Sequence, residues 1–204
     1  MKILVTGCAG FIGFHITKKL LKKKSNKIYG IDNLNKFYDV NLKKNRLNIL
    51  NEFKNFTFDK IDIRNKKLVS KNFLKNKYDI VIHLAAQAGV RYSYEKPELY
   101  INTNINGFNN IIENSRIIKV KHFIFASTSS VYGNLQKYPY KESFENLSPE
   151  SLYAATKLAN ENIAYSFSKI FKLPCTGIRF FTVYGPYGRP DMALFKFVSN
   201  IKKN

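Results

Sequence analysis

The chain has 204 residues, and its content of 45% hydrophobic and 15% aromatic residues is typical of a folded globular protein and not of a disordered one. The apolar runs are too short for a membrane-spanning helix, and we expect no secretory signal because Gly7 interrupts the N-terminal run. Lysine and arginine outnumber acidic residues by 34 to 14, and Cys8 and Cys175 are expected to be free thiols in a cytoplasmic protein.

Strands and helices are predicted to alternate along the chain. The predicted strands cover residues 2–6, 27–31, 56–58, 79–84, 122–126 and 175–180. The helical patterns that follow them cover, in the same order, residues 11–24, 42–50, 68–74, 97–118, 148–171 and 192–201. Ser148-Pro149-Glu150 is a cap signal for the fifth helix. This alternation predicts an α/β fold, with right-handed βαβ units and a parallel sheet covered on both faces.

A glycine-rich turn, Thr6-Gly7-Cys8-Ala9-Gly10-Phe11-Ile12-Gly13, follows the first predicted strand and leads into a helix. Glycines at these positions allow a tight turn and a close approach of the backbone to a pyrophosphate at the helix N-terminus. The second strand closes on Asp32, whose carboxylate can accept hydrogen bonds from both adenosine ribose hydroxyls and would repel a 2′-phosphate. We therefore predict a Rossmann-type, doubly wound sheet that binds NAD; the alternative is a glycine-rich turn with an incidental aspartate.

Further cofactor candidates lie at the C-terminal ends of predicted strands, where ligands bind in open α/β sheets. Asp62 and Ile63 are placed to meet the adenine, and the small residues after His83 let the chain pass close to the cofactor. The complete predicted set is Gly7, Gly10, Phe11, Ile12, Gly13, Asp32, Asn33, Asn35, Asp62, Ile63, Leu84, Ala85, Ala86, Gln87, Thr103, Tyr153 and Lys157. His83 is expected to be a core histidine, and no metal site is predicted because the histidines and cysteines lack metal-ligand spacing.

Tyr153 and Lys157 are four residues apart in a predicted helix, so their side chains share one face. A tyrosine with an ordinary pKa near 10 is a poor base, but a nearby ammonium and a cationic nicotinamide stabilise its phenolate and lower that pKa. The predicted strand end Ser127-Thr128-Ser129-Ser130 supplies hydroxyls for the same substrate oxygen. The alternative is an ordinary helix surface; the glycine-rich turn and Asp32 together favour a catalytic pair.

With these motifs the chain resembles the extended short-chain dehydrogenase/reductases, specifically the nucleotide-sugar epimerases and most closely the bacterial UDP-glucuronate 4-epimerases. The resemblance rests on residues 6–13, 30–35, 83–93 (HLAAQAGVRYS), 151–157 (SLYAATK) and 179–193 (RFFTVYGPYGRPDMA). It implies Tyr153 as the base, Lys157 as its electrostatic partner and Thr128 as the helping hydroxyl, at a position that is usually Ser. It also implies a homodimer, formed through the long helices, where the complete fold is present.

The reaction that the resemblance implies is NAD-dependent 4-epimerisation of UDP-glucuronate to UDP-galacturonate through a 4-keto intermediate. Dehydratases and decarboxylases of the superfamily carry an acid just before Val131-Tyr132-Gly133, where this chain has Ser129 and Ser130. The substrate carboxylate is expected to meet Ser129, Ser130, Thr182 and Arg189, with Arg91 as a weaker candidate for the carboxylate or the diphosphate. For both arginines the alternative is surface charge. The alternative functions are a UDP-galactose 4-epimerase, a UDP-uronate decarboxylase and a non-catalytic NAD-binding module.

Two regions are expected in the chain: an NAD-binding domain at residues 1–182 and the beginning of a truncated substrate-binding region at residues 183–204. Members of the family are longer, and their later part supplies much of the small domain that grips the nucleotide. We therefore expect either a fragment of a longer protein or a cofactor domain that needs a partner, with a complete cofactor site and an incomplete substrate site.

The net charge of +20 has two interpretations. Such a charge is typical of proteins that bind nucleic acid or an anionic membrane. However, the lysines are scattered, as at residues 22–24, 43–44, 66–67 and 202–203, and form no arginine-rich stripe with stacking aromatics. A coding bias toward lysine and asparagine is therefore favoured, with general attraction of a polyanionic substrate as a lesser role. We predict no specific nucleic-acid partner and no membrane partner.

Overall fold

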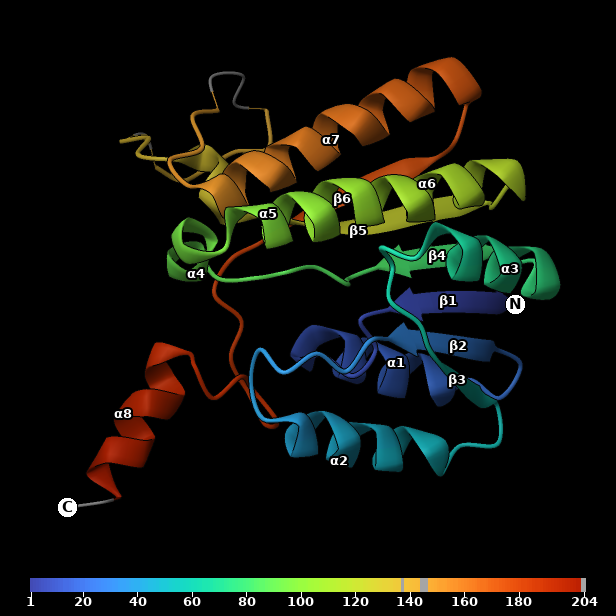
Figure 1. Cartoon of the computed structure of the whole chain (residues 1–204), viewed down its shortest axis with the longest axis horizontal. Helices are drawn as coiled ribbons and strands as arrows, with labels where there is room; N and C mark the ends of the chain where they lie inside the picture. The colour runs from blue at the N-terminus through green and yellow to red at the C-terminus, as the bar shows by residue number, and fades with distance from the viewer. Residues whose placement is uncertain (137, 144–146, 203–204) are drawn as a thin grey trace.

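The structure, a computed structural model of the chain, describes residues 1–136, 138–143 and 147–202 (Figure 1). Its centre is a six-stranded parallel sheet with the strand order β3-β2-β1-β4-β5-β6. The strands are β1 (Lys2–Thr6), β2 (Lys27–Asp32), β3 (Phe56–Lys60), β4 (Ile80–His83), β5 (His122–Thr128) and β6 (Cys175–Phe180). The predicted doubly wound α/β fold is confirmed, and the strand order reverses between β1 and β4, where ligands bind in such sheets.

Helices cover both faces of the sheet, as Figure 1 shows. One face carries α1 (Phe11–Leu21) and α2 (Val40–Asn51). The other face carries α3 (Lys66–Asn76), α6 (Phe108–Ile117) and α7 (Leu152–Phe171). The shorter helical segments are α4 (Val90–Glu95), α5 (Pro97–Tyr100), the π-helical η1 (Ile101–Gly107), the 3₁₀-helical η2 (Ser129–Tyr132) and α8 (Ala193–Ile201).

Two hydrophobic clusters hold these layers together. Phe108 and Phe123 belong to the cluster on the face covered by α3, α6 and α7, and Phe14 belongs to the cluster beneath α1 and α2. Successive side chains of β1 alternate between the two, because Leu4 packs in the first cluster and Val5 in the second. The central strand is therefore buried on both faces, as its unbroken apolar sequence predicts.

Besides shifts of one to three residues at the ends of α1, α2, α3 and α8, the helices differ from the prediction in three places. The predicted start at Ser148-Pro149-Glu150 is wrong: α7 begins at Leu152, because Ser151 Oγ accepts a hydrogen bond from Ala154 N–H at 3.1 Å and caps the helix. The long helix predicted over residues 97–118 is interrupted by η1. The short α4 is absent from the prediction, since six residues are too few to show a clear helical period.

The chain leaves the sheet after β6. Residues 181–192 contain turns and extended segments, and α8 then projects away from the sheet (Figure 1). Three large apolar side chains of α8, Phe197, Val198 and Ile201, are exposed. The boundary expected at residue 182 stays a prediction.

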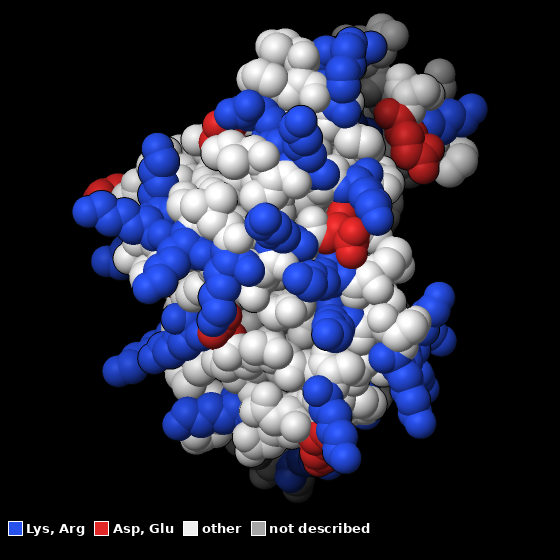
Figure 2. Space-filling view, turned by 90° about the vertical axis from the view of Figure 1, so that its right-hand side faces the viewer, with Lys and Arg blue, Asp and Glu red and all other residues white. Residues whose placement is uncertain are grey.

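Figure 2 shows the face of the molecule at the N-terminal ends of the strands, which lysine and arginine side chains largely cover. Exposed lysines precede the strands in separate loops, among them Lys24, Lys54, Lys121 and Lys172. Helices end at this face, and the partial negative charge of a helix C-terminus favours nearby cations. The basic residues are thus distributed over several loops. Among the described residues, no helix is long and apolar enough to cross a membrane.

Candidate functional site

A cavity of about 480 Å³ lies along the C-terminal ends of the strands. It brings together most of the predicted site residues: Gly7, Gly10, Phe11, Ile12, Gly13, Asp32, Asn33, Asn35, Ile63, Leu84, Ala85, Ala86, Gln87, Thr103, Thr128, Ser129, Ser130, Tyr153, Lys157, Thr182 and Arg189. Two predicted residues, Asp62 and Arg91, do not line it. Arg91 lies exposed on α4, and the role expected for it stays a prediction.

The glycine-rich turn between β1 and α1 forms the floor of one end of the cavity. Gly7 has φ +71°, and a Cβ atom there would lie 2.8 Å from the backbone nitrogen of Ala85. A Cβ atom on Gly13 would lie 2.1 Å from the carbonyl oxygen of Gly7. α1 begins at Phe11, so its first backbone N–H groups have no intrahelical acceptor and form a site suited to an anion.

Asp32 lies at the end of β2 beside this turn. Its Oδ1 accepts a hydrogen bond from Leu34 N–H at 2.8 Å, and its Oδ2 accepts one from Ala9 N–H at 3.2 Å. Burial raises the pKa of Asp32, and the Leu34 amide, the charge of Lys43 and the Ala9 amide oppose that rise. The carboxylate is therefore held in one orientation at the wall of the cavity.

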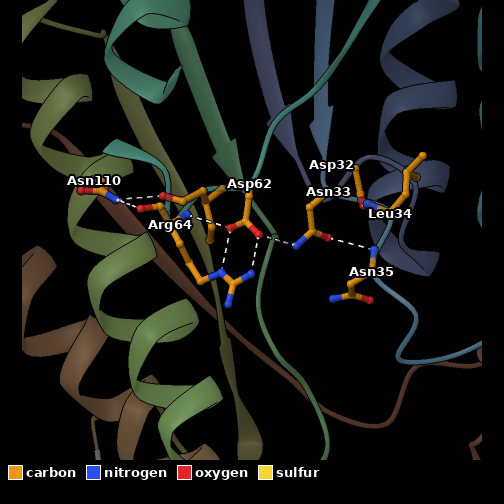
Figure 3. A network of polar contacts seen from close by, with 8 residues as sticks. Asp32, Asn33, Leu34, Asn35, Asp62, Arg64 and Asn110 are labelled. Carbon is orange, nitrogen blue, oxygen red and sulfur yellow. Dashed lines mark hydrogen bonds and ion pairs between the residues drawn. The ribbon is translucent and has the colours of Figure 1, made fainter. Parts of the chain in front are cut away.

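A polar network extends from Asn33 to α6 and holds Asp62 outside the cavity wall (Figure 3). Arg64 donates from Nε to Asp62 Oδ1 at 3.0 Å and from Nη2 to Oδ2 at 2.7 Å, and Asn33 Nδ2 donates to Oδ2 at 3.0 Å. Burial raises the pKa of Asp62, but these hydrogen bonds outweigh it and lower the pKa to about 2. Asn110 Nδ2 donates to the Ile63 carbonyl at 2.9 Å. The network thus orients Ile63, which lines the cavity, while the Asp62 carboxylate faces Arg64.

The opposite end of the cavity carries the predicted catalytic residues on β5 and α7. Thr128 Oγ1 donates to Ser130 Oγ at 3.2 Å, and Lys157 Nζ donates to the Ala126 carbonyl at 3.0 Å. Burial lowers the pKa of Lys157 to about 8. Since an ammonium has three donors and the described residues supply one acceptor, Lys157 keeps donors for a ligand.

The pKa of Tyr153 differs from the prediction. Burial raises it above its ordinary value, while a hydrogen bond with Thr128 and the charge of Arg189 lower it. Lys157 is not among the groups that lower it. Its ammonium is buried and bonded to the Ala126 carbonyl. In the protein alone, Arg189 therefore has the electrostatic effect on the phenol that the sequence assigns to Lys157.

The third part of the cavity wall comes from the segment after β6, which carries Thr182 and Arg189. Arg189 Nε donates to Asp191 Oδ1 at 3.0 Å, and Nη2 donates to Oδ2 at 2.5 Å. The guanidinium also lies over the ring of Phe37, 5.5 Å from its centroid. This wall therefore presents a cation close to Tyr153, with its charge shared by one carboxylate.

His83 is a core histidine, as predicted. Its ring is 2% exposed, Nδ1 lies 2.7 Å from Thr6 Oγ1, and burial lowers its pKa to about 3. Cys8 and Cys175 are free thiols. No group of three or more metal-ligating side chains occurs among the described residues.

Sequence reasoning missed a brace behind the catalytic residues. Glu161, one turn after Lys157 on α7, accepts hydrogen bonds from Ser127 Oγ at 2.5 Å and from Arg179 Nε at 3.0 Å. Arg179 Nη2 completes the ion pair with Glu161 Oε2 at 2.8 Å. The brace joins α7 to β5 and β6, so it holds Thr128 and Lys157 at a constant separation. Its helical spacing from Lys157 is the signal that could have found Glu161.

Three comparisons with known proteins agree with this geometry. The family described as GDP-mannose 4,6 dehydratase matches residues 4–204. The chain is 51% identical to protein CapI of Staphylococcus aureus, over 98% of this chain and 60% of the relative. It is 44% identical to a probable UDP-glucuronate 4-epimerase of Rhizobium meliloti, over 98% of this chain and 59% of the relative.

The solved structures show the same likeness. A UDP-glucuronic acid 4-epimerase of Bacillus cereus, in complex with UDP-glucuronic acid and NAD, superposes with a TM-score of 0.92 at 37% identity. The superposition covers 100% of this chain and 63% of that one. The chain therefore spans about three fifths of the length of these three proteins.

Proposed function

Because the chain belongs to the GDP-mannose 4,6 dehydratase family, we propose that it is the cofactor-binding and catalytic part of an NAD-dependent nucleotide-sugar 4-epimerase that acts on UDP-glucuronate. One observation carries the proposal: a single cavity has the glycine-rich turn and Asp32 at one end and Thr128, Tyr153 and Lys157 at the other. This arrangement suits a dinucleotide that reaches from an adenosine site to a reacting sugar.

The residues of the chain fit NAD. The N-terminus of α1 and the close-packed Gly7 and Gly13 suit a pyrophosphate, and the oriented carboxylate of Asp32 suits a ribose diol. Lys157 retains donors for the second ribose. When bound, NAD supplies a hydride acceptor that later returns the same hydride, so the net redox change is zero.

In the proposed reaction Tyr153 accepts the proton of the sugar 4-OH as C4 loses its hydride, which leaves a 4-keto sugar. Thr128 hydrogen-bonds the same oxygen, and the charge of Arg189 stabilises the phenolate. The 4-keto sugar then rotates in the site, so that the hydride returns to the opposite face of C4. The 4-oxygen recovers its proton from Tyr153. The configuration at C4 is inverted, and no atom is lost from the substrate.

The substrate carboxylate is proposed to lie against Ser129, Ser130, Thr182 and Arg189. The lining of the cavity supports this assignment, since it includes these three hydroxyls and one guanidinium. Its described carboxylates are Asp32 and Asp191, of which Asp191 is paired with Arg189. Among the described lining residues, no carboxylate other than the Arg189-paired Asp191 accompanies the residues proposed to hold the substrate carboxylate, which favours epimerisation over dehydration.

We extend the proposal to a cytoplasmic homodimer that acts in polysaccharide biosynthesis. Exposed apolar side chains on α6 and α7, among them Ile117, Tyr165 and Ile170, support pairing through these helices. Such side chains on adjacent helices are the usual basis of a two-fold interface.

The test is to incubate the purified chain with NAD and UDP-glucuronate and to identify the product by proton NMR. UDP-galacturonate is expected, with Tyr153→Phe as the inactive control that still binds NAD. The reaction is repeated with the part of the Rhizobium meliloti relative that this chain does not match. A UDP-pentose would identify a decarboxylase, and conversion of UDP-galactose alone would identify a galactose epimerase. If NAD binds but no UDP-sugar is converted in either reaction, the chain is a non-catalytic NAD-binding module.

A further inference from the structure

Arg46 links two segments that are far apart in the sequence and that both lie at the cavity, namely the glycine-rich turn and the segment after β6. It lies on α2, its side chain is 0% exposed, and neither Asp nor Glu pairs with it among the described residues. Its Nη1 donates to the Ala9 carbonyl at 2.8 Å, and its Nη2 donates to the Tyr187 carbonyl at 2.6 Å. One guanidinium therefore joins the glycine-rich turn to a segment that lies 141 residues beyond Arg46 in the sequence.

The chemistry of this position points to more than packing. A buried guanidinium that has only neutral acceptors carries a desolvation penalty that an apolar side chain of the same size would avoid. Nη1 also donates to Tyr38 Oη at 2.7 Å, while Nε has no partner in the structure. The charge of Arg46 lowers the pKa of Asp32, so the guanidinium interacts electrostatically with a proposed cofactor ligand.

The segment at the other end of the bridge is held in an unfavourable conformation. Tyr187 has φ +57°, a left-handed conformation that is strained for a residue other than glycine. Its carbonyl is the acceptor of Arg46, and its ring packs against Phe14 with 5.3 Å between centroids. His15 Nε2 lies 2.8 Å from the Pro186 carbonyl. Polar contacts from α1 and α2 thus hold residues 186–188 in place.

Arg189 follows Tyr187 by two residues and lines the cavity. Its position therefore depends on the conformation of Tyr187, and through Arg46 on the conformation of the turn at Ala9. An anion bound at the glycine-rich turn contacts the backbone segment whose Ala9 carbonyl accepts a hydrogen bond from Arg46 Nη1. A carboxylate bound at Arg189 contacts the segment whose Tyr187 carbonyl accepts a hydrogen bond from Arg46 Nη2.

We propose that Arg46 is a positioning residue that couples NAD binding at the glycine-rich turn to the ordering of residues 183–192, and so to the affinity for the uronate carboxylate. This inference rests on the proposed function. Coupling between two sites is reciprocal, so each ligand raises the affinity for the other by the same factor, typically 5- to 150-fold. We expect about tenfold here, at the lower end of that range.

The experiment measures hydrogen exchange of peptides that cover residues 183–192, with and without saturating NAD. In the native chain NAD is expected to slow exchange in this segment by about the tenfold coupling factor. Arg46→Met removes both bridging donors and is expected to abolish this protection while NAD still binds. Arg46→Lys keeps the charge but cannot reach both carbonyls, so it is expected to leave protection from exchange incomplete. This second variant keeps the test valid if Arg46→Met does not fold.

Arg116→Met is the matched control, because Arg116 lies on α6 in a surface ion pair with Glu113 and should leave the effect of NAD unchanged. The inference is overturned if NAD binds the native chain without slowing exchange in residues 183–192, or if Arg46→Lys shows full protection. Failure of NAD to bind the native chain would instead overturn the proposed function. The reciprocal measurement is the affinity for UDP-glucuronate with and without NAD, whose ratio should fall toward one in both Arg46 variants.

Discussion

The two walls of the cavity are built in different ways. At the cofactor end, Cys8 and Ala9 of the glycine-rich turn are 0% exposed, and backbone atoms pack so closely that a single added methyl group would overlap them. In the segment after β6, Phe181 is 58% and Tyr184 is 76% exposed. The first wall is shaped by backbone packing within the sheet, and the second by a few side-chain contacts to α1 and α2.

This difference decides what a substitution can do in each region. In a close-packed turn there is no free volume, so a change of one methyl group must move backbone atoms. In an exposed segment most side chains have water on one side, and their removal changes little. We therefore expect the effects of mutation to fall steeply from the glycine-rich turn to α8.

The largest effect on NAD binding is expected for Gly13→Ala. The added Cβ would lie 2.1 Å from the carbonyl oxygen and 2.8 Å from the carbonyl carbon of Gly7, so the turn must open. Overpacking of this kind costs about 1–3 kcal/mol, and we expect about a 100-fold loss of NAD affinity, measured by calorimetric titration. Gly10→Ala is the control, since its Cβ would approach only the Gly7 oxygen, at 3.0 Å, and a loss of about tenfold is expected. Equal losses in the two variants would refute the role given to this contact.

The cofactor end could be predicted from the sequence because its determinants are local. The turn at residues 6–13 and the aspartate at the end of β2 are adjacent in sequence to the strands and helix that place them. The same holds for Tyr153 and Lys157, whose spacing in a helix sets a common face. Short apolar runs likewise predicted all six strands, most clearly the central β1, which is buried on both faces.

The other contacts could not be predicted because they join residues far apart in the chain. The partners in the Arg46–Tyr187 and Glu161–Arg179 contacts depend on how α2 and α7 pack, because the spacing of Glu161 from Lys157 indicates its helix face but not its partner. Asp62 was correctly placed at a strand end, but the direction of its carboxylate depends on Arg64 and Asn33. The start of α7 was misplaced because Ser148 and Ser151 are both capping residues, and only tertiary packing selects Ser151.

A smaller effect of opposite sign is expected for Lys157→Met, which tests whether the buried catalytic end of the cavity is optimised for function or for stability. Burial lowers the pKa of Lys157 from 10.5 to about 8, so the folded state disfavours the ammonium. The stability contribution of a group with a depressed pKa is present above about pH 10.5 and is lost as the pH falls through 8. At pH 7 the buried charge therefore destabilises the folded chain.

One pKa unit corresponds to about 1.4 kcal/mol, so removal of this charge raises the unfolding free energy at pH 7 by up to about 3 kcal/mol. The unpaired Ala126 carbonyl offsets part of the gain. We expect the unfolding free energy of Lys157→Met to rise by about 1–3 kcal/mol at pH 7, and by less at pH 10. Urea denaturation at both pH values measures this, with the exposed Lys169→Met on the same helix as the control. A variant no more stable than the native chain at pH 7 would show that the ammonium is well solvated.

The smallest effect is expected for Phe197→Ala on α8, with Phe14→Ala on α1 as the matched comparison. Phe14 on α1 is 1% exposed, and its truncation should lower the unfolding free energy by about 3–5 kcal/mol through lost burial and a cavity. Phe197 is 64% exposed, and the same change should alter that free energy by less than about 0.5 kcal/mol, because alanine leaves no cavity and favours the helix. Thermal unfolding of both variants, followed by circular dichroism at two protein concentrations, measures the difference. A loss above about 2 kcal/mol for Phe197→Ala that grew with protein concentration would mean that α8 is buried against a second copy of the chain. The contrast between the buried region around the turn and the exposed region after β6 would then hold only for the isolated chain.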